Sequence, residues 1–261
     1  MTPFNKIFFS KTAFQIVLYC CICFQSGLLA ENLSGRPAQG TMGLLPRFSM
    51  FKLTTADLQN GVGATLVSRM NSGLDLVWEL ATERMLFTVY ADIVQSQLNP
   101  PTDSLDTSRN KELQNNRQVL GGGGLGVGFF PFTHHDFSLT LMHSYHQVYF
   151  FHAGASSSVL VMDRVTLPEL GLRAALNFFR LGFLTVGGNA TVTSVFSTSS
   201  ANQDIRHGYG VEGRITGSFE IDPSFQIELS SINSYFLFAS RSANESKIEI
   251  GALAGIRLTL D

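Results

Sequence analysis

The stretch KIEIGALAGIRLTL at residues 247–260 decides the fold. Its even positions are all apolar, whereas its odd positions include Lys247, Glu249 and Arg257. Successive side chains of a β-strand point to opposite faces, so this alternation predicts a strand with one apolar face and one face of mainly polar or small residues.

The same two-residue period recurs through most of the chain and predicts a series of long strands. We expect them near 225–240, 207–221, 181–196, 165–179, 137–152, 118–132, 85–95 and 73–82. One further strand, at either 47–56 or 61–70, would give an even count. We favour about ten strands in total, with eight or twelve as alternatives. Strands of this length are longer than the five or six residues usual in soluble sheets and suit a tilted crossing of a membrane.

The expected connections alternate between short and long. Tight turns fall at 133–136, 180 and 222–224, whereas longer polar segments fall at 96–118, 153–164, 197–206 and 241–246. Phenylalanines flank the tight turns, and aromatic residues also stand at the opposite strand ends, which predicts two aromatic girdles at two membrane interfaces. These features predict an all-β fold: an up-and-down antiparallel transmembrane β-barrel.

The composition agrees with this fold. Hydrophobic residues make up 44% of the 261-residue chain, charged residues only 15%, and the mean hydropathy is +0.15. A usual soluble domain carries about 25% charged residues. Beyond the first thirty residues no apolar run reaches the ~18 residues of a membrane-spanning helix, so the apolar excess must lie on strands.

The first thirty residues have the features of a secretory signal peptide. Lys6 and Lys11 precede an apolar run at 13–24, and the small residue Ala30 suits the position before the cleavage site. We therefore expect three segments: a signal peptide at 1–30 cleaved near Ala30, a flexible periplasmic lead-in at 31–46, and the barrel at 47–261.

Cleavage would remove every cysteine and two of the 18 basic residues. Cys20, Cys21 and Cys23 all lie in the signal segment, so the mature chain would have no disulfide. Sixteen basic residues would then face 20 acidic ones. This balance predicts no basic surface for nucleic acid.

Taken together, these features resemble the small outer-membrane barrels of the OmpA/OmpX type. The resemblance covers roughly residues 45–261 and is one of pattern, without a family-specific motif. It implies export to the outer membrane of a Gram-negative bacterium, contact with outer-membrane lipid, and periplasmic chaperones and the barrel-insertion machinery as partners during assembly. One feature departs from it: such barrels usually finish on an aromatic residue, whereas this chain ends on Leu260-Asp261. The sequence leaves the oligomeric state open.

If the apolar face meets lipid, the other face fills the lumen of the barrel. The residues expected to form a polar lumen network are Asp75, Glu79, Asp92, Glu169, Arg173, Glu212, Arg214, Glu220, Lys247, Glu249 and Arg257. A barrel of about eight to ten strands is narrow enough for side chains to fill it, whereas wide general porins need 16–18 strands. The network therefore predicts a paired polar core, with a narrow aqueous or proton path as the alternative.

Two residue pairs could support catalysis by an outer-membrane enzyme. Ser144 and His146 share a strand face, and Asp204 and His207 lie near a loop, but neither pair matches a catalytic pattern well. The glycines at 121–128 lie on an expected strand with no following Lys-Ser/Thr, so no phosphate site is expected. We expect no catalytic, cofactor-binding or metal-binding residue.

The leading expectation is a non-enzymatic, porin-like outer-membrane barrel with surface loops for structural, binding or narrow-channel roles. The first alternative is an outer-membrane enzyme that acts on lipid or peptide through Ser144/His146 or Asp204/His207. The second is a secreted soluble barrel that binds a ligand. The soluble alternative requires that Ile248 and Ile250 be buried and that Glu212 and Arg214 be solvated.

Overall fold

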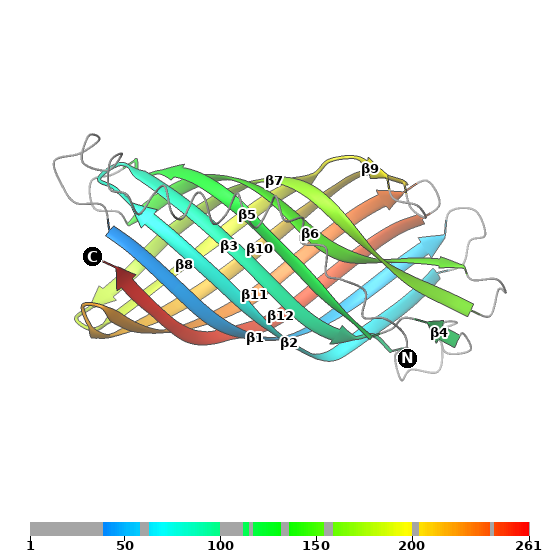
Figure 1. The fold of residues 1–261 in the computed structure, drawn as a ribbon, viewed down its shortest axis with the longest axis horizontal. Helices are drawn as coiled ribbons and strands as arrows, with labels where there is room; N and C mark the ends of the chain where they lie inside the picture. The colour runs from blue at the N-terminus through cyan, green and yellow to red at the C-terminus, as the bar shows by residue number, and fades with distance from the viewer. Residues whose placement is uncertain are drawn as a thin grey trace, which may run out of the picture.

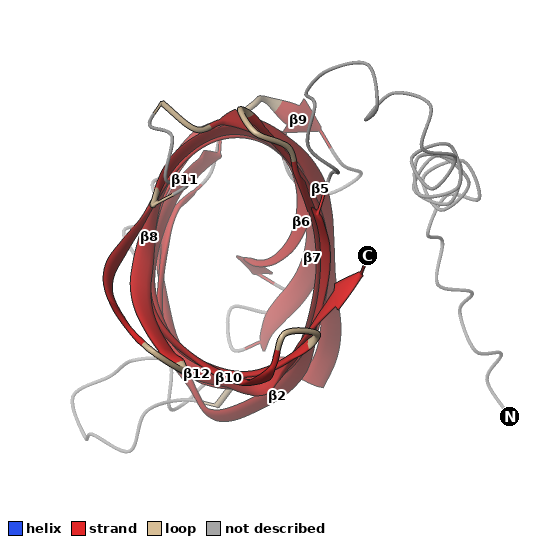
Figure 2. Ribbon diagram, turned by 90° about the vertical axis from the view of Figure 1, so that its left-hand side faces the viewer, coloured by secondary structure: helices blue, strands red, loops and turns tan. Residues whose placement is uncertain are grey.

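The computed structural model forms a closed antiparallel barrel (Figure 1; Figure 2). It describes residues 39–57, 63–99, 112–114, 117–131, 136–153, 159–199, 204–240 and 243–260. The ten wall strands are β1 (Gln39–Asp57), β2 (Gly63–Ala81), β3 (Met85–Gln97), β5 (Arg117–Phe129), β6 (Phe137–Ala153), β7 (Val159–Leu181), β8 (Leu184–Val195), β10 (Asp204–Asp222), β11 (Phe225–Ser240) and β12 (Ala243–Leu260). Each wall strand pairs with its neighbours in the chain, and β1 pairs with β12 to close the ring.

Two short strands lie outside this wall order. β4 (Glu112–Gln114) pairs in parallel with the loop end of β7, and β9 (Thr198–Ser199) pairs with β10. Within the parts of the chain that the structure describes, no helix is long and apolar enough to cross a membrane.

The expected count of ten wall strands is confirmed, and the structure identifies the tenth. Residues 47–56 belong to β1, whereas 61–70 does not form a separate strand, because its described part is the beginning of β2. Residues 39–46 were expected in a flexible lead-in, but they form the start of β1. Within this strand Pro46 pairs with Leu74 on β2, whereas the register with β12 passes over both Leu45 and Pro46. The expected signal peptide and residues 31–38 lie outside the described residues.

The two faces of the wall differ as the alternation predicted. On β12 the side chains of Ile248 and Ile250 are 43% and 54% exposed, whereas Glu249 between them is 2% exposed. Large apolar side chains are exposed on the same outward face of the other strands. This distribution contradicts the requirement of a soluble barrel that the Ile248 face be buried.

We call the end of the barrel that holds the beginning of β1 and the end of β12 the turn end. The connections 82–84, 182–183 and 223–224 lie there, and the opposite end is the loop end. The long connection expected at 241–246 is shorter than predicted, because β12 begins at Ala243. Aromatic side chains are exposed near both ends: Phe129, Phe178, Phe179 and Phe183 toward the turn end, and Tyr145, Phe196, Tyr209 and Tyr235 toward the loop end.

The β6–β7 hairpin leaves the wall near the loop end. Pairing between β5 and β6 stops at Gly122 and His146, and pairing between β7 and β8 stops at Glu169 and Val195. Beyond these pairs β6 and β7 remain paired with each other, so residues 147–153 and 159–168 form a two-stranded segment that we call the mouth ribbon. Figure 1 shows the green strands β6 and β7 bending across the loop end of the barrel.

The β6 arm of the mouth ribbon is buried on both of its faces at residues 148–150, whereas Arg164 and Thr166 on the β7 arm are exposed. Three consecutive residues, Val148, Tyr149 and Phe150, are all buried, which a wall strand with one lipid face would not allow. Tyr149 packs in a first apolar cluster with Phe51, Leu53, Leu66, Leu98, Leu120 and Met162. Val148 and Phe150 pack in a second with Val165, Leu167, Val195, Ile205 and Phe238.

These two clusters join the ribbon to opposite sides of the barrel. Apart from ribbon residues, the first draws on β1, β2, β5 and the residue that follows β3, and the second on β8, β10 and β11. We refer to the two clusters together as the apolar plug. Tyr149, Phe150 and Phe238 were expected in the girdle at the loop end, but they lie in this plug.

Candidate functional site

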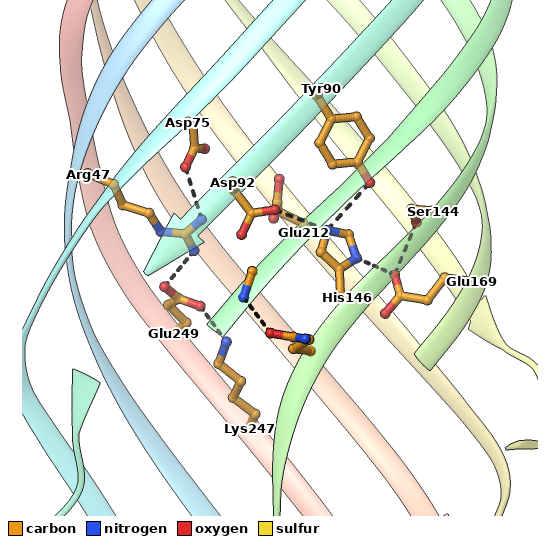
Figure 3. Close-up of polar contacts among 12 residues, drawn as sticks. Arg47, Asp75, Tyr90, Asp92, Ser144, His146, Glu169, Glu212, Lys247 and Glu249 are labelled. Atoms are coloured by element: carbon orange, nitrogen blue, oxygen red, sulfur yellow. Dashed lines mark hydrogen bonds and ion pairs between the residues drawn. The ribbon is translucent and has the colours of Figure 1, made fainter. Parts of the chain in front are cut away.

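The middle of the lumen holds a cluster of charged side chains centred on Arg47 (Figure 3). Arg47 Nη2 lies 2.5 Å from Glu249 Oε1, and Arg47 Nη1 lies 3.5 Å from Asp75 Oδ1. Lys247 Nζ contacts the second oxygen of Glu249 at 2.7 Å. These side chains come from β1, β2 and β12, so the ion pairs link the strands on both sides of the closure between β1 and β12.

Arg214 extends this cluster across the lumen. Its Nη1 lies 3.5 Å from Asp75 Oδ2, although β10 and β2 are not neighbours in the wall. Its Nε lies 2.7 Å from Glu212 Oε1 on the same strand. An ion pair between non-adjacent strands must pass through the interior, so Arg214 and Asp75 occupy the space that an open pore would need.

A second cluster surrounds His146 on β6. His146 Nδ1 lies 2.9 Å from Glu169 Oε2, and His146 Nε2 lies 3.4 Å from Asp92 Oδ1 and 3.5 Å from the Tyr90 hydroxyl. The Tyr90 and His146 rings are stacked with their centroids 5.8 Å apart. Ser144 Oγ donates to Glu169 Oε2 at 3.4 Å. The imidazole therefore lies between two carboxylates from opposite sides, as Figure 3 shows.

The strand glycines explain how the His146 ring fits. Gly122 is the register partner of His146, and a Cβ at Gly122 would overlap the imidazole ring. A glycine there leaves room for the ring beside β5. The glycine run therefore has a steric role on a lumen-facing strand.

A third cluster lies closer to the turn end. Arg257 Nη1 lies 2.7 Å from Glu79 Oε2, and Arg257 Nε lies 2.9 Å from Glu228 Oε2. Arg257 Nη1 also donates to Thr41 Oγ1 at 3.4 Å, and Ser230 Oγ donates to Glu228 Oε1 at 3.2 Å. Because buried charges are costly unless they are paired, these contacts offset much of the cost of a charged interior.

Most of the residues predicted for the lumen network take part in these three clusters. Those with an ion pair are Asp75, Glu79, Asp92, Glu169, Glu212, Arg214, Lys247, Glu249 and Arg257. Arg173 lines the lumen cavity, and its Nε has no hydrogen-bond partner among the described residues. Glu220 was also expected in the network, but its side chain is exposed near the end of β10, beside an irregularity in the register with β11.

Sequence reasoning did not include five members of the clusters: Arg47, Thr41, Tyr90, Glu228 and Ser230. Arg47 was placed at the very start of a possible strand, so its face could not be assigned. Glu228 lies on the same face of β11 as Gln226 and Ser230, because the three residues are at alternate positions. This polar alternation in the sequence could have predicted that Glu228 faces the lumen. Tyr90 was placed on the polar face of its strand but was not included in the network.

A lumen cavity of about 140 Å³ lies between the Arg47 and His146 clusters. Its lining includes Asp75, Asp92, Arg173 and Glu249, while Phe51 and Leu120 of the apolar plug border it. A cavity of this size with polar walls can hold a few water molecules or one small polar solute.

The two pairs considered for catalysis differ in position. Ser144 and His146 both contact the Glu169 carboxylate, so each is bound to the acid rather than arranged as a nucleophile with its base. Asp204 begins β10, and His207 follows a register shift that leaves its side chain exposed. The described contacts thus bring Ser144 and His146 to one carboxylate, and His207 lies outside the lumen clusters.

The structure defines a class: an all-β, ten-stranded, up-and-down antiparallel barrel of the transmembrane type. No protein-family model matches the chain, and no curated protein sequence matches it significantly.

Solved structures of outer-membrane barrels are similar to the chain at low identity. The outer membrane protease OmpT from Escherichia coli is 10% identical with a TM-score of 0.45, and the match covers 85% of this chain and 96% of that one. An outer-membrane channel from Pseudomonas putida F1 is 9% identical with a TM-score of 0.44, covering 88% and 98%. The translocator domain of the autotransporter NalP from Neisseria meningitidis is 9% identical with a TM-score of 0.35, covering 92% and 97%. Identities and TM-scores this low do not support assigning the activity of these proteins to this chain. The function must therefore be argued from this chain's own residues.

Proposed function

We propose that the chain is a non-enzymatic integral protein of the bacterial outer membrane. Its barrel anchors the connections at the loop end and encloses a polar compartment that side chains largely fill. The observation that carries this proposal is the division of the wall into two faces, apolar outside and ion-paired inside.

The outward face supports the membrane location. Exposed side chains such as Ile250, Leu172 and Ile215 would lose contact with water on entering lipid, and exposed aromatic residues stand toward both ends. A water-soluble protein of this size rarely exposes so much contiguous apolar surface. The closed ring also satisfies the backbone hydrogen bonds that a bilayer requires.

The lumen supports a closed compartment in preference to an open pore. Arg214 and Asp75 bridge non-adjacent strands across the interior, and the apolar plug covers the loop end. We propose that the barrel in this conformation conducts ions poorly. The finer assignment to the OmpA/OmpX type stays a prediction.

Extraction and gel migration test the membrane proposal. We expect the protein to remain in the outer-membrane fraction until detergent is added. We also expect a faster-migrating band in unheated samples, because a closed barrel resists unfolding by detergent. Recovery in the soluble fraction without detergent, together with a single band at all temperatures, would contradict the proposal.

The non-enzymatic part is tested separately with Ser144→Ala and His146→Ala. We expect membranes that contain the wild type, either variant or no copy of the protein to have the same content of lipid hydrolysis products. A wild-type level of product that falls in both variants would identify an enzyme.

A further inference from the structure

We propose that the mouth ribbon is a hinged gate. In its second position it swings out of the lumen and pairs with the free edge of β5, which connects the lumen cavity to the loop end. This inference rests on the proposed function, because a gate has a role only where the barrel separates two compartments.

The hinge lies at one level of the barrel. The β5–β6 ladder ends at His146, and the β7–β8 ladder ends at Glu169, with one further backbone hydrogen bond from Phe196 N to Pro168 O at 3.0 Å. Within the hairpin, Ser144 pairs with Glu169 and His146 pairs with Leu167, so both arms are released at nearly the same height. Pro168 lies between them and has no N–H to donate to a ladder. A two-stranded segment released from β5 and β8 at one height can rotate as a unit, and beyond that height β7 pairs only with the three-residue strand β4 among the described residues.

Beyond Gly122, the edge of β5 has no strand partner on the β6 side within the described parts of the chain. Side chains of the ribbon form hydrogen bonds with its backbone N–H and C=O groups instead. Two such hydrogen bonds run from Gly121 N to Gln147 Oε1 at 3.0 Å and from Arg164 Nη1 to Val119 O at 3.2 Å. Unpaired strand edges need such partners. Since a backbone ladder can supply the same donors and acceptors, the edge of β5 can be satisfied in two ways.

The register already present defines the second position. Continuing outward from Gly122 and His146 places Gln118 opposite Phe150 and Val119 opposite Tyr149. Val119 is 41% exposed on the outward face, so Tyr149 would join it there, four residues beyond the exposed Tyr145. In this wall position Tyr149 would face outward, whereas Val148 and Phe150 would face the lumen.

Packing makes the closed position the favoured one. Phe150 and Tyr149 are buried in the two halves of the plug, with the Phe150 and Phe238 rings 5.9 Å apart and the Phe51 and Tyr149 rings 6.0 Å apart. The Tyr149 hydroxyl also bonds with Ser96 Oγ. Opening must break these contacts, so the open position is a minor state whose population the Tyr149 hydroxyl controls.

A cysteine pair traps the open position. Gln118→Cys with Phe150→Cys places two thiols directly opposite each other only when the ribbon has joined β5, and such opposed positions suit a disulfide. The matched control is Leu125→Cys with His143→Cys, which are register partners in the closed structure and exposed on the same two strands. The three natural cysteines lie in the expected signal peptide.

The rate of trapping is compared in Tyr149→Phe and Tyr145→Phe backgrounds, with the barrel in lipid vesicles under mild oxidation. Loss of the buried hydroxyl contacts should raise the rate by roughly five- to thirty-fold, whereas Tyr145→Phe on the outward face should leave it unchanged. The oxidised barrel should also conduct more current across a planar bilayer than the reduced one.

Two results would overturn the gate. In one, the control pair cross-links but the test pair stays reduced even with Tyr149→Phe, which identifies a fixed plug. In the other, the test pair cross-links without a change in conductance, so the ribbon moves but closes nothing. Cross-linking of the control pair in protein recovered from the soluble fraction would instead overturn the proposed function.

Discussion

Arg47 Nη2 lies 2.5 Å from Glu249 Oε1, and this ion pair joins the first wall strand to the last. The two side chains are 202 positions apart in the sequence and both are buried. The pair therefore stabilises the closure of the ring itself, in addition to the backbone ladder between β1 and β12.

Replacing Arg47 by alanine should strongly destabilise the barrel. Glu249 and Asp75 would each lose an ion-pair partner in the lumen, and breaking a buried pair on one side costs about 3–5 kcal/mol. The free energy of unfolding in urea, measured in lipid vesicles, checks this. Lys52→Ala alters an exposed side chain of the same strand and should change stability by less than about 0.5 kcal/mol. Equal losses in the two variants would refute the role of the pair.

An arginine on the outward face should destabilise the barrel according to its depth. Ile250 lies near the middle of β12 and Leu260 at its turn end. Arginine at the centre of the bilayer costs about 2–4 kcal/mol and near an interface about 0–1 kcal/mol. We therefore expect Ile250→Arg to unfold at much lower urea concentration than Leu260→Arg. Indistinguishable unfolding curves would argue that this face does not meet lipid.

A methyl group at Gly122 should disturb the His146 cluster. Its Cβ would overlap the imidazole, and overpacking of this kind costs about 1–3 kcal/mol. Gly213→Ala is the control, because a Cβ there has no atom within 4 Å. Thermal unfolding should separate the two variants clearly. If Gly122→Ala is as stable as Gly213→Ala, His146 does not need the space.

The turn between β7 and β8 should require glycine at position 182. Gly182 has a φ of 53°, a conformation that costs most other residues about 1–2 kcal/mol. Gly182→Ala should lower the stability by about that amount, whereas Gly182→Asn should cost less, since asparagine tolerates this region. Refolding yield into vesicles and urea unfolding of the pair provide the measurement, and a stable Gly182→Ala barrel would contradict the prediction.

The strand pattern by itself identified the barrel and most of the lumen cluster members. The reason is local: side chains alternate with period two, so parity alone assigns Glu249 and Arg257 to the face opposite Ile250. The same reasoning reaches Glu228. It fails for Glu220, because a register irregularity near the turn and the end of the strand leave that side chain exposed.

Only the tertiary structure decided which charges meet and where the wall opens. Alternation places Arg214 and Asp75 on an inner face but cannot show that β10 and β2 face each other across the lumen. Alternation also predicted that β6 stays in the wall over its whole length, with Tyr149 at the membrane interface. That prediction was wrong for this conformation, because β6 leaves the wall after His146. Burial of Tyr149 and Phe150 between opposite sides of the barrel outweighs the local preference for a continuous ladder, because apolar contacts between residues distant in the sequence exist only once the ring has closed.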